Sequence, residues 1–390
     1  MPRVLIVRGH QATPWELRPW QELPARFQVS FLLTRSNRFA TPQGLRPERV
    51  RALRDLLPGG ALGDAGALLL GDRYLDAERH FASADIVHAE ELSYWFAAEA
   101  ATRKRAHGFK LVQTVWETLP LLGAYRNRHA RRYRERVLAE TDLFLAATER
   151  AATTLRLEGV EDARIAVCPP GIDVQRFAVA PPDPPPTAHT IVSPGRLVWE
   201  KGHHDALRAL AALHRGVVTL AGGEVVKPRL RIVGAGPEAQ RLREHAAELG
   251  LGDAVEIGAV PYERMPAVFA GASAMVLASQ SSAGAGLHPF DIPHAFWEEQ
   301  FGMVLIEALA AGLAIVATTN GAIPEVLAGA PAELVAPGDW MGIARALAAG
   351  PLGRPPGARV PAPPAVLERY STAAAAQRLA DAYDGLLESA

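Results

Sequence analysis

Short apolar runs alternate with longer helix-like segments along almost the whole chain, and this alternation restricts the fold more than any other feature. In the first half, runs of strand length occupy residues 4–7, 29–33, 67–70, 86–88, 111–115, 143–146 and 165–167. Strands separated by helices pair in parallel, because each crossover needs a connection of helix length. The alternation therefore predicts a doubly wound α/β domain, in which helices cover both faces of a parallel sheet.

A proline-rich tract, Pro181-Pro182-Asp183-Pro184-Pro185-Pro186, interrupts the alternation near the middle of the chain. Such a tract is stiff and extended and cannot join the interior of a sheet. The alternation resumes beyond it, with strand-like runs at 230–233, 255–257 and 274–277. A length of 390 residues also fits two domains of ordinary size. We therefore expect one domain over 1–180 and another over 187–369, which close on a ligand between them.

The most informative stretch is WEEQFGMVLIEALAAG, residues 297–312. A polar loop runs into Gly302, and an amphipathic helix follows it. The amides of Gly302, Met303 and Val304 lie at the start of this helix, where backbone donors lack intrahelical partners and the helix dipole is positive. This end of the helix is therefore suited to bind a phosphate.

Two glutamates flank the start of this helix. Glu299 precedes it, whereas Glu307 lies about one turn inside it and points back toward its first residues. Ionised carboxylates accept hydrogen bonds from hydroxyl groups. A phosphate held between two hydroxyl acceptors is typical of a site for a sugar nucleotide.

These residues resemble the paired-glutamate motif of family 4 retaining glycosyltransferases, and the segment EQFGMVLIEALAAGLAIVATTNGAIPE (299–325) reads like that family nearly without a break. The resemblance implies the GT-B fold, two doubly wound Rossmann-like domains facing each other across a cleft. It implies a transferase of EC class 2.4 that moves a sugar from a nucleoside diphosphate with retention. It also implies that Glu307 holds the ribose hydroxyls, that Glu299 holds a hydroxyl of the donor sugar, and that Phe301 belongs to the donor site.

The start of the second domain, IVSPGRLVWEKG (191–202), also resembles the family. Arg196 and Lys201 would grip the donor diphosphate and, with Glu299, form the catalytic set, since guanidinium and ammonium groups both suit phosphate. Gly234 and Gly236 follow the next strand and would lie near the nucleotide. Taken alone, this pair is a weak signal, because the third glycine of a dinucleotide fingerprint is missing.

Three loops of the first domain follow strands and are candidates for the acceptor or sugar side. The family often has paired glycines where this chain has Gly9 and His10. Glu90 follows a strand that ends in a histidine, and we expect that His88 is a core residue hydrogen-bonded to backbone. At Trp116 many members have a histidine that contacts the donor sugar, and an indole cannot accept a hydrogen bond. Either Trp116 or Glu117 holds the sugar in another way, or activity is lost.

Two further segments have two interpretations each. The basic stretch 126–136 faces either anionic lipid or, as charge runs usually do, solvent. The loop 279–295 is either a lid or, through His288, Asp291 and His294, a metal site, although the spacing matches no common ligand pattern. Residues 370–390 form a last helix, which in relatives crosses back to the first domain.

The composition limits the classes of partner that the chain is expected to bind. Lysine and arginine number 41 against 42 acidic residues, so the chain has no general attraction to nucleic acid. One cysteine excludes an intrachain disulfide, and no apolar run is long enough to span a bilayer or form a signal peptide. We expect a cytoplasmic protein that needs no cofactor or metal and that is membrane-peripheral if the basic stretch 126–136 faces lipid. Its substrates would be a UDP-, GDP- or ADP-sugar and a saccharide, lipid or small-molecule acceptor.

Other interpretations remain open. One is a protein that binds sugar nucleotides without transfer, which the replacement of histidine by Trp116 favours. Another is a different GT-B enzyme, such as an epimerase or a phosphorylase. A nicotinamide oxidoreductase rests only on Gly234 and Gly236.

Overall fold

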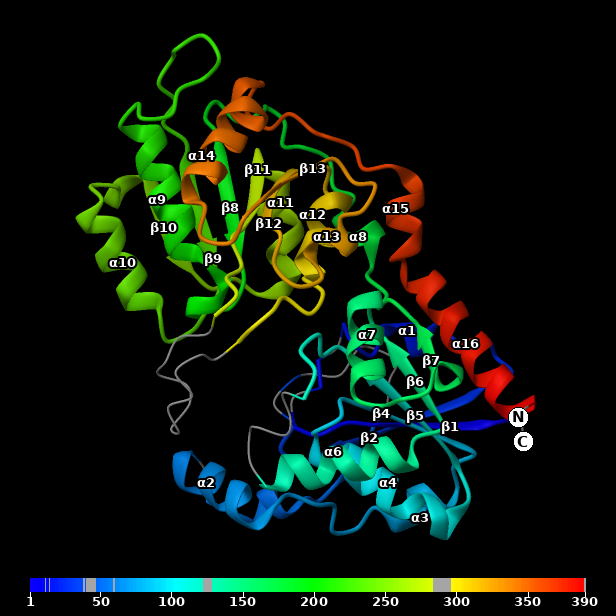
Figure 1. Ribbon diagram of the computed structural model, residues 1–390. Helices are drawn as coiled ribbons and strands as arrows, with labels where there is room; N and C mark the ends of the chain where they lie inside the picture. The colour runs from blue at the N-terminus through cyan, green and yellow to red at the C-terminus, as the bar shows by residue number, and fades with distance from the viewer. Residues whose placement is uncertain are drawn as a thin grey trace. The chain divides into compact units, whose positions relative to one another are not determined.

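The computed structural model describes residues 1–390 except 11, 14, 38, 40–46, 59, 122–127, 283–295 and 389–390. The chain divides into two compact units (Figure 1). The first unit comprises Met1–Ile172 and Tyr370–Ala390, and the second unit comprises Asp173–Arg369. Each contains one parallel sheet with helices on its faces. The predicted class, two doubly wound α/β domains, is confirmed.

The first unit is built on a seven-stranded sheet in the order β3-β2-β1-β4-β5-β6-β7, in which every neighbouring pair is parallel. Its strands are β1 (Arg3–Val7), β2 (Gln28–Thr34), β3 (Glu48–Val50), β4 (Ile86–Glu90), β5 (Lys110–Val115), β6 (Leu143–Ala146) and β7 (Ile165–Val167). Its helices are α1 (Arg18–Gln21), α2 (Ala61–Leu70), α3 (Glu78–Ala82), α4 (Trp95–His107), α6 (Arg128–Glu140), α7 (Glu149–Leu157) and α16 (Thr372–Glu388), with short 3-10 turns at Leu53–Leu56 and Asp162–Arg164.

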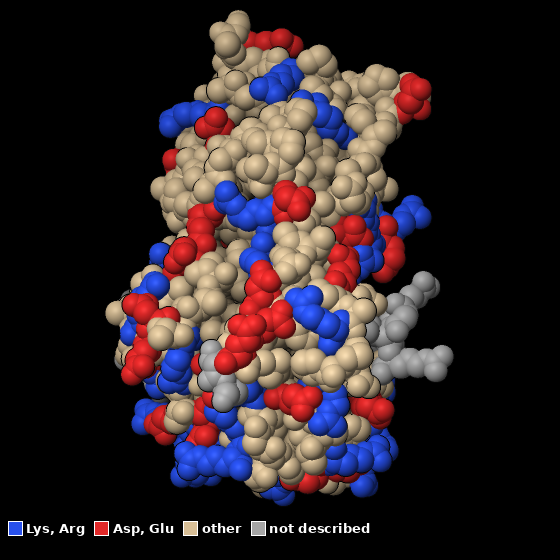
Figure 2. Space-filling view, turned by 90° about the vertical axis from the view of Figure 1, so that its right-hand side faces the viewer, with Lys and Arg blue, Asp and Glu red and all other residues tan. Residues whose placement is uncertain are grey.

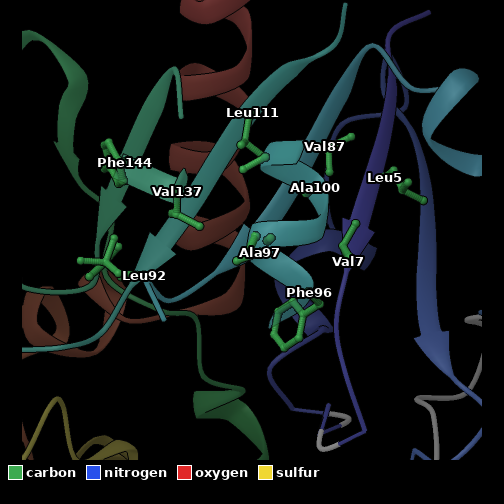
Figure 3. Packing of buried hydrophobic residues seen from close by; sticks show 14 of the residues in the cluster. Leu5, Val7, Val87, Leu92, Phe96, Ala97, Ala100, Leu111, Val137 and Phe144 are labelled. Atoms are coloured by element: carbon green, nitrogen blue, oxygen red, sulfur yellow. The ribbon is translucent and has the colours of Figure 1, made fainter. Parts of the chain in front are cut away.

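Residues alternate between two cores across this sheet, as the two-residue period of a strand requires. On one face Leu5 and Val7 pack with helices α3, α4, α6 and α7. Figure 3 shows Phe96, Ala97 and Ala100 of α4 directed at the strands on this face. On the other face Val4 and Ile6 pack with α1 and α16, including Trp20, Leu379 and Tyr383. The sheet is therefore buried on both sides.

The C-terminal helix α16 completes the second of these cores. The phenol of Tyr383 is fully buried and accepts a hydrogen bond of 2.8 Å from Trp20 Nε1. Arg378 donates to the carbonyl oxygen of Pro169 at 2.9 Å. The last helix of the chain thus belongs to the unit in which the chain begins.

The second unit is built on a six-stranded parallel sheet in the order β10-β9-β8-β11-β12-β13. Its strands are β8 (Thr190–Pro194), β9 (Arg229–Val233), β10 (Val255–Gly258), β11 (Ala274–Leu277), β12 (Ala314–Thr318) and β13 (Ala332–Val335). Its helices are α8 (Val174–Phe177), α9 (His203–His214), α10 (Ala239–Glu248), α11 (Met265–Ala270), α12 (Met303–Ala310), α13 (Ile323–Val326), α14 (Trp340–Ala349) and α15 (Pro364–Arg369). Short 3-10 turns lie at Trp199–Lys201, Gly252–Ala254, Tyr262–Arg264 and Pro351–Gly353.

Strand order reverses between β1 and β4 in the first sheet and between β8 and β11 in the second. Ligands of open α/β sheets bind beyond the carboxyl ends of the strands at such a reversal. The reversal in the second sheet is the place where the predicted donor residues meet.

One strand prediction is wrong, and three strands, β3, β12 and β13, were not predicted. Residues 67–70 belong to helix α2, and its leucines at 69 and 70 are largely exposed. The run ALLL has the apolar character of a buried strand, but it lies at the surface, where burial does not select strand geometry. The short edge strand β3 escaped prediction because two of its three residues, Glu48 and Arg49, are charged and exposed.

Candidate functional site

The central feature of the second unit is an ion pair between Lys201 and Glu299. Lys201 ends the 3-10 turn after β8, and its Nζ lies 2.9 Å from Oε1 and 2.7 Å from Oε2 of Glu299. Both side chains are nearly buried, with 14% and 8% of their surfaces exposed. A buried pair of this kind needs further hydrogen bonds to offset the loss of hydration.

Two polar residues supply those hydrogen bonds. Ser279, just after β11, donates its hydroxyl to Glu299 Oε2 at 2.8 Å. Asn320, just after β12, accepts the backbone N–H of Glu299 at 2.6 Å through Oδ1. Trp297 places its ring 4.8 Å from Lys201 Nζ, in cation–π range. The carboxylate is therefore fixed by the ends of three neighbouring strands.

The start of helix α12 lies directly beside this carboxylate. Gly302 has φ of +76°, in the left-handed region that favours glycine, and a Cβ there would be 3.4 Å from Cγ of Glu299. Met303 and Val304 open the helix and are partly exposed, so solutes can reach this end. Phe301 is 2% exposed and belongs to the core, so it supports the loop from behind.

Glu307 is buried within the same helix, five residues beyond Gly302. Its Oε1 accepts a hydrogen bond of 2.7 Å from the hydroxyl of Tyr262, at the turn after β10. Burial raises the pKa of Glu307 to about 7, while the Tyr262 bond and the charge of Arg176 act in the opposite direction. The guanidinium of Arg176 stacks 4.6 Å above the ring of Tyr262. Glu307 thus titrates near neutral pH in the absence of a ligand.

Arg196 and the two glycines complete the predicted donor residues. Arg196 leaves 66% of its side chain in solvent and lies 3.9 Å from Glu200, which makes its guanidinium accessible to a ligand. A Cβ at Gly234 would lie 1.8 Å from the carbonyl oxygen of Gly195, and one at Gly236 would lie 2.3 Å from that of Leu197. Both positions therefore need glycine because two strand-end loops pack backbone to backbone, a reason independent of any nucleotide.

In the first unit, a second charged cluster lies at the ends of β1 and β4. Arg8 is 2% exposed and its Nε lies 3.2 Å from Oε2 of Glu90. Glu16 approaches the same place, and burial together with the charge of Glu90 raises its pKa to about 7. Gly9 is packed against the ring of Phe96, since a Cβ there would lie 3.0 Å from that ring.

The remaining predicted residues of this unit hold their own loops. The backbone N–H of Trp116 donates to Glu91 Oε1 at 3.0 Å. Glu117 Oε1 accepts the backbone N–H groups of Thr118 and Leu119, both at 3.0 Å. His10 is partly buried and lines a cavity with the residues that follow β2 and β3.

His88 is fully buried, as expected for a core histidine, but its partners differ from the prediction. Its ring nitrogens lie 2.5 Å from the hydroxyl of Tyr383 and 2.7 Å from that of Thr114. Burial lowers the pKa of His88 well below its ordinary value, so the ring is neutral. Side chains rather than backbone satisfy it, because α16 brings a phenol to this strand.

Several residues at the donor site were not predicted as site residues. Ser279, Asn320, Tyr262 and Arg176 stand in turns or short helices, and only their partners give them a role. Most of the predicted lid, with His288, Asp291 and His294, lies outside the described residues, as do residues 126 and 127 of the basic stretch.

Two family models match the chain. The model of Glycosyltransferase Family 4 matches residues 20–176, and the model of Glycosyl transferases group 1 matches residues 175–349. Each model covers nearly all of one half, and the second includes every predicted donor residue.

Curated relatives match parts of the chain. The putative colanic acid biosynthesis glycosyltransferase WcaL of Escherichia coli is 30% identical over 210 residues, which are 53% of this chain and 47% of that protein. A GDP-mannose-dependent alpha-(1-6)-phosphatidylinositol monomannoside mannosyltransferase of Mycolicibacterium smegmatis is 34% identical over 138 residues, 35% and 31% of the two chains. The chain thus spans less than half of the length of these relatives.

Solved structures share the whole fold. Alr3699/HepE of Anabaena, in complex with UDP and glucose, superposes with a TM-score of 0.70 at 16% identity and covers 99% of this chain and 100% of its own. Sucrose-phosphate synthase from Thermosynechococcus elongatus gives a TM-score of 0.70 at 17% identity, with 100% of both chains covered. At such identities the likeness establishes the fold, that of the GT-B glycosyltransferases.

Proposed function

We propose that this chain, which belongs to the family 4 type of glycosyltransferases, transfers a sugar from a nucleoside diphosphate to an acceptor hydroxyl with retention of configuration. The observation that carries the proposal is the Lys201–Glu299 pair, which lies against the start of α12 at the carboxyl ends of the strands. A diphosphate bound there meets a cation and a helix N-terminus, and a sugar beside it meets a carboxylate.

The difficult step is departure of the diphosphate. The bond between the sugar carbon and the phosphate oxygen breaks, the acceptor oxygen bonds to that carbon, and the acceptor proton passes to the leaving phosphate. Arg196, Lys201 and the first amides of α12 stabilise the charge that grows on the diphosphate. Because these groups supply positive charge, we propose that the transfer needs no metal ion.

Each glutamate has its own part in this proposal. In this structure Lys201 is paired with Glu299, and we propose that an arriving phosphate competes for the ammonium group. Glu299 can then accept a hydroxyl of the donor sugar. Glu307 lies one turn deeper in the helix and would accept hydrogen bonds from the ribose hydroxyls. It must be ionised to do so.

The donor can be identified by calorimetric titration with UDP, GDP and ADP, each with and without magnesium. The names of similar proteins mention UDP and GDP-mannose, so UDP and GDP are tested first. We expect one nucleotide to bind in either condition. A matched control is Arg243→Gln, an exposed arginine of α10 that should leave affinity unchanged. Absence of binding by all three nucleotides would contradict the proposed donor site.

We assign the acceptor to the first unit, where Glu90, His10 and the loops of Trp116 and Glu117 follow the strands. Glu90 is already held by Arg8, and Glu117 by the backbone N–H groups of Thr118 and Leu119, so their carboxylates are preorganised. Carboxylates in fixed positions are suited to accept hydrogen bonds from the hydroxyl groups of an acceptor substrate.

The first unit also carries a surface suited to anionic lipid. Helix α6 exposes arginines, and helix α2 exposes leucines that leave 62–80% of their surface in solvent. The two helices meet, because His129 Nε2 lies 3.1 Å from the carbonyl oxygen of Leu69 (Figure 1). The exposed residues are Arg128, Arg131, Arg132 and Arg136 on α6, and Leu62, Leu69 and Leu70 on α2.

Leucines of such exposure usually mark an interaction surface. Arginines beside them match the phosphates and acyl chains of an anionic membrane, so we propose peripheral contact through α2 and α6. Elsewhere charge is mixed: the face in Figure 2 shows acidic and basic side chains interspersed. Of the helices that the structure describes, none is both long and apolar enough to cross a bilayer.

Vesicle sedimentation tests this contact. The chain should bind vesicles of phosphatidylcholine mixed with phosphatidylglycerol and not phosphatidylcholine alone. Replacing Leu69 and Leu70 together by serine should weaken binding about tenfold or more, because two apolar side chains no longer enter the interface. The control is Val217→Ser in the second unit, where valine is 65% exposed. Equal effects of both changes would argue against the contact, as would self-association that the double change abolishes.

A further inference from the structure

A cavity of about 680 Å³ opens in the first unit beyond the carboxyl ends of β1, β2 and β3. Its volume lies within the range of about 300–1,000 Å³ that is usual for small-molecule sites. The position is the one at which open parallel sheets bind ligands. Among the described residues, those that line it are His10, Arg35, Ser36, Arg51, Arg54, Asp55, Leu56, Leu57 and Gly60.

Three arginines reach this cavity from three different places. Arg35 follows β2, Arg51 follows β3, and Arg54 lies in the next 3-10 turn. Arg35 and Arg51 are neighbours, because the backbone N–H of Arg35 donates to the carbonyl oxygen of Val50 at 2.9 Å. The pairing of β2 with β3 therefore brings together arginines that have no regular spacing in the sequence.

Asp55, the acidic residue among the lining residues that the structure describes, accepts hydrogen bonds from backbone groups. Asp55 accepts the N–H of Ser36 at 3.1 Å through Oδ1 and that of Ala52 at 2.8 Å through Oδ2. It fastens the two loops together and its oxygens are directed at amides. A carboxylate engaged in this way competes weakly for an arginine that faces the cavity.

The acids outside the lining act similarly. Asp72 Oδ1 accepts the backbone N–H of Arg54 at 3.1 Å. Asp76 accepts both the backbone N–H and Nε of Arg51, at 2.8 and 3.2 Å, at a half-exposed ion pair that solvent screens. Arg54 donates Nη1 to the carbonyl oxygen of Pro58 at 3.0 Å, which orients its guanidinium at the cavity wall.

From this arrangement we infer that the cavity binds a phosphate group carried by the acceptor. Arginines from three segments that line one cavity suit the oxygens of a phosphate. The cavity is much larger than a phosphate alone, so a polyol or sugar attached to it also fits. The inference rests on the proposed transferase function, to which it adds the chemical class of the acceptor.

The phosphate can come from a free sugar phosphate or from a lipid head group. Calorimetric titration with glucose 6-phosphate, a phosphomonoester, and with glycerophosphoglycerol, a phosphodiester head group without acyl chains, separates the two sources. Glucose and glycerol are the neutral counterparts. We expect one phosphorylated probe to bind and its neutral counterpart not to bind.

Substitutions locate the binding. Arg35→Gln and Arg54→Gln should each weaken binding of the phosphorylated probe about tenfold. If the hydrogen bond of Arg54 to its loop is needed for folding, Arg35→Gln alone tests the inference. Arg49→Gln is the matched control, because Arg49 is an exposed residue of β3 that does not line the cavity. Titrations repeated with Lys201→Ala remove the phosphate site of the second unit from the result.

Two results would overturn the inference: neither phosphorylated probe binds more tightly than its neutral counterpart, or Arg49→Gln weakens binding as much as Arg35→Gln. Nucleotide titration distinguishes this failure from failure of the proposed function. A chain that binds a nucleotide in the second unit and no phosphorylated probe in the first remains a transferase with another kind of acceptor.

Discussion

Replacing Lys201 by alanine is expected to lower kcat/KM for transfer about a hundredfold or more and to weaken nucleotide binding. The ammonium group lies within 2.9 Å of both oxygens of Glu299, beside the start of α12. Its loss removes a cation from the place where charge grows on the diphosphate. Single donors of this type contribute about a hundredfold to a thousandfold in other enzymes. Steady-state kinetics and calorimetry measure both effects.

The same substitution also affects stability, and the two effects can be separated. Alanine leaves Glu299 buried without its cation, which typically costs about 3–5 kcal/mol. Combining Lys201→Ala with Glu299→Gln removes the buried charge, so the free energy of unfolding should recover while transfer does not. Trp116→His is the control for the first unit and should leave nucleotide affinity unchanged. Unaltered nucleotide affinity in Lys201→Ala would remove the basis of the donor site.

Nucleotide binding is expected to strengthen as the pH rises through about 7, and Glu307→Gln should abolish this dependence. Burial raises the pKa of Glu307 to about 7, so near neutrality part of the population is protonated and a poorer acceptor for ribose hydroxyls. Glutamine keeps the shape and can still accept from Tyr262. Affinity should fall about tenfold or more at high pH in the variant and differ little from wild type at pH 5. An identical pH profile in the two proteins would contradict the role of Glu307.

Stability should show the opposite dependence on pH. The folded pKa of Glu307, about 7, lies above its ordinary value of 4.5, so the folded state binds the proton more tightly. The contribution of this group is therefore fully present below pH 4.5 and is lost as the pH rises to about 7. The loss amounts to a few kcal/mol at most. Denaturant unfolding of wild type and Glu307→Gln across this range measures it, with Tyr262 and Arg176 as the facing groups in both proteins.

The sequence predicted the fold well where burial selects the residues. Strands such as β1 and β4 are buried on both faces, so their apolar runs are read directly. The strand prediction failed at residues 67–70, because exposed leucines such as Leu69 and Leu70 form the same apolar run as buried ones. The edge strand β3 has charged residues and no apolar run, and only its pairing with β2 makes it a strand.

The candidate site was predicted in part, for a related reason. Glu299, Gly302 and Glu307 are close in sequence, and one helix start relates them. Their partners are distant: Lys201 is 98 residues from Glu299, and Tyr262 is 45 residues from Glu307. Such pairs depend on which strands end side by side, which periodicity does not specify. The cavity of the first unit escaped notice because its arginines come from three separate segments.

The position of α16 has a consequence for how the protein is made. The second unit is inserted into the first, and the two crossing points touch, since the N–H of Ile172 donates to the carbonyl oxygen of Tyr370 at 2.8 Å. During synthesis from the N-terminus, Asp173–Arg369 leaves the ribosome before the first unit has its last helix. Until Tyr383 arrives, Trp20 Nε1 and His88 Nδ1 lack the partner that they have in the finished fold, and one face of their sheet lacks its cover. The unit synthesised first is therefore the one completed last, and in the nascent chain one face of its N-terminal sheet stays uncovered until α16 has been made.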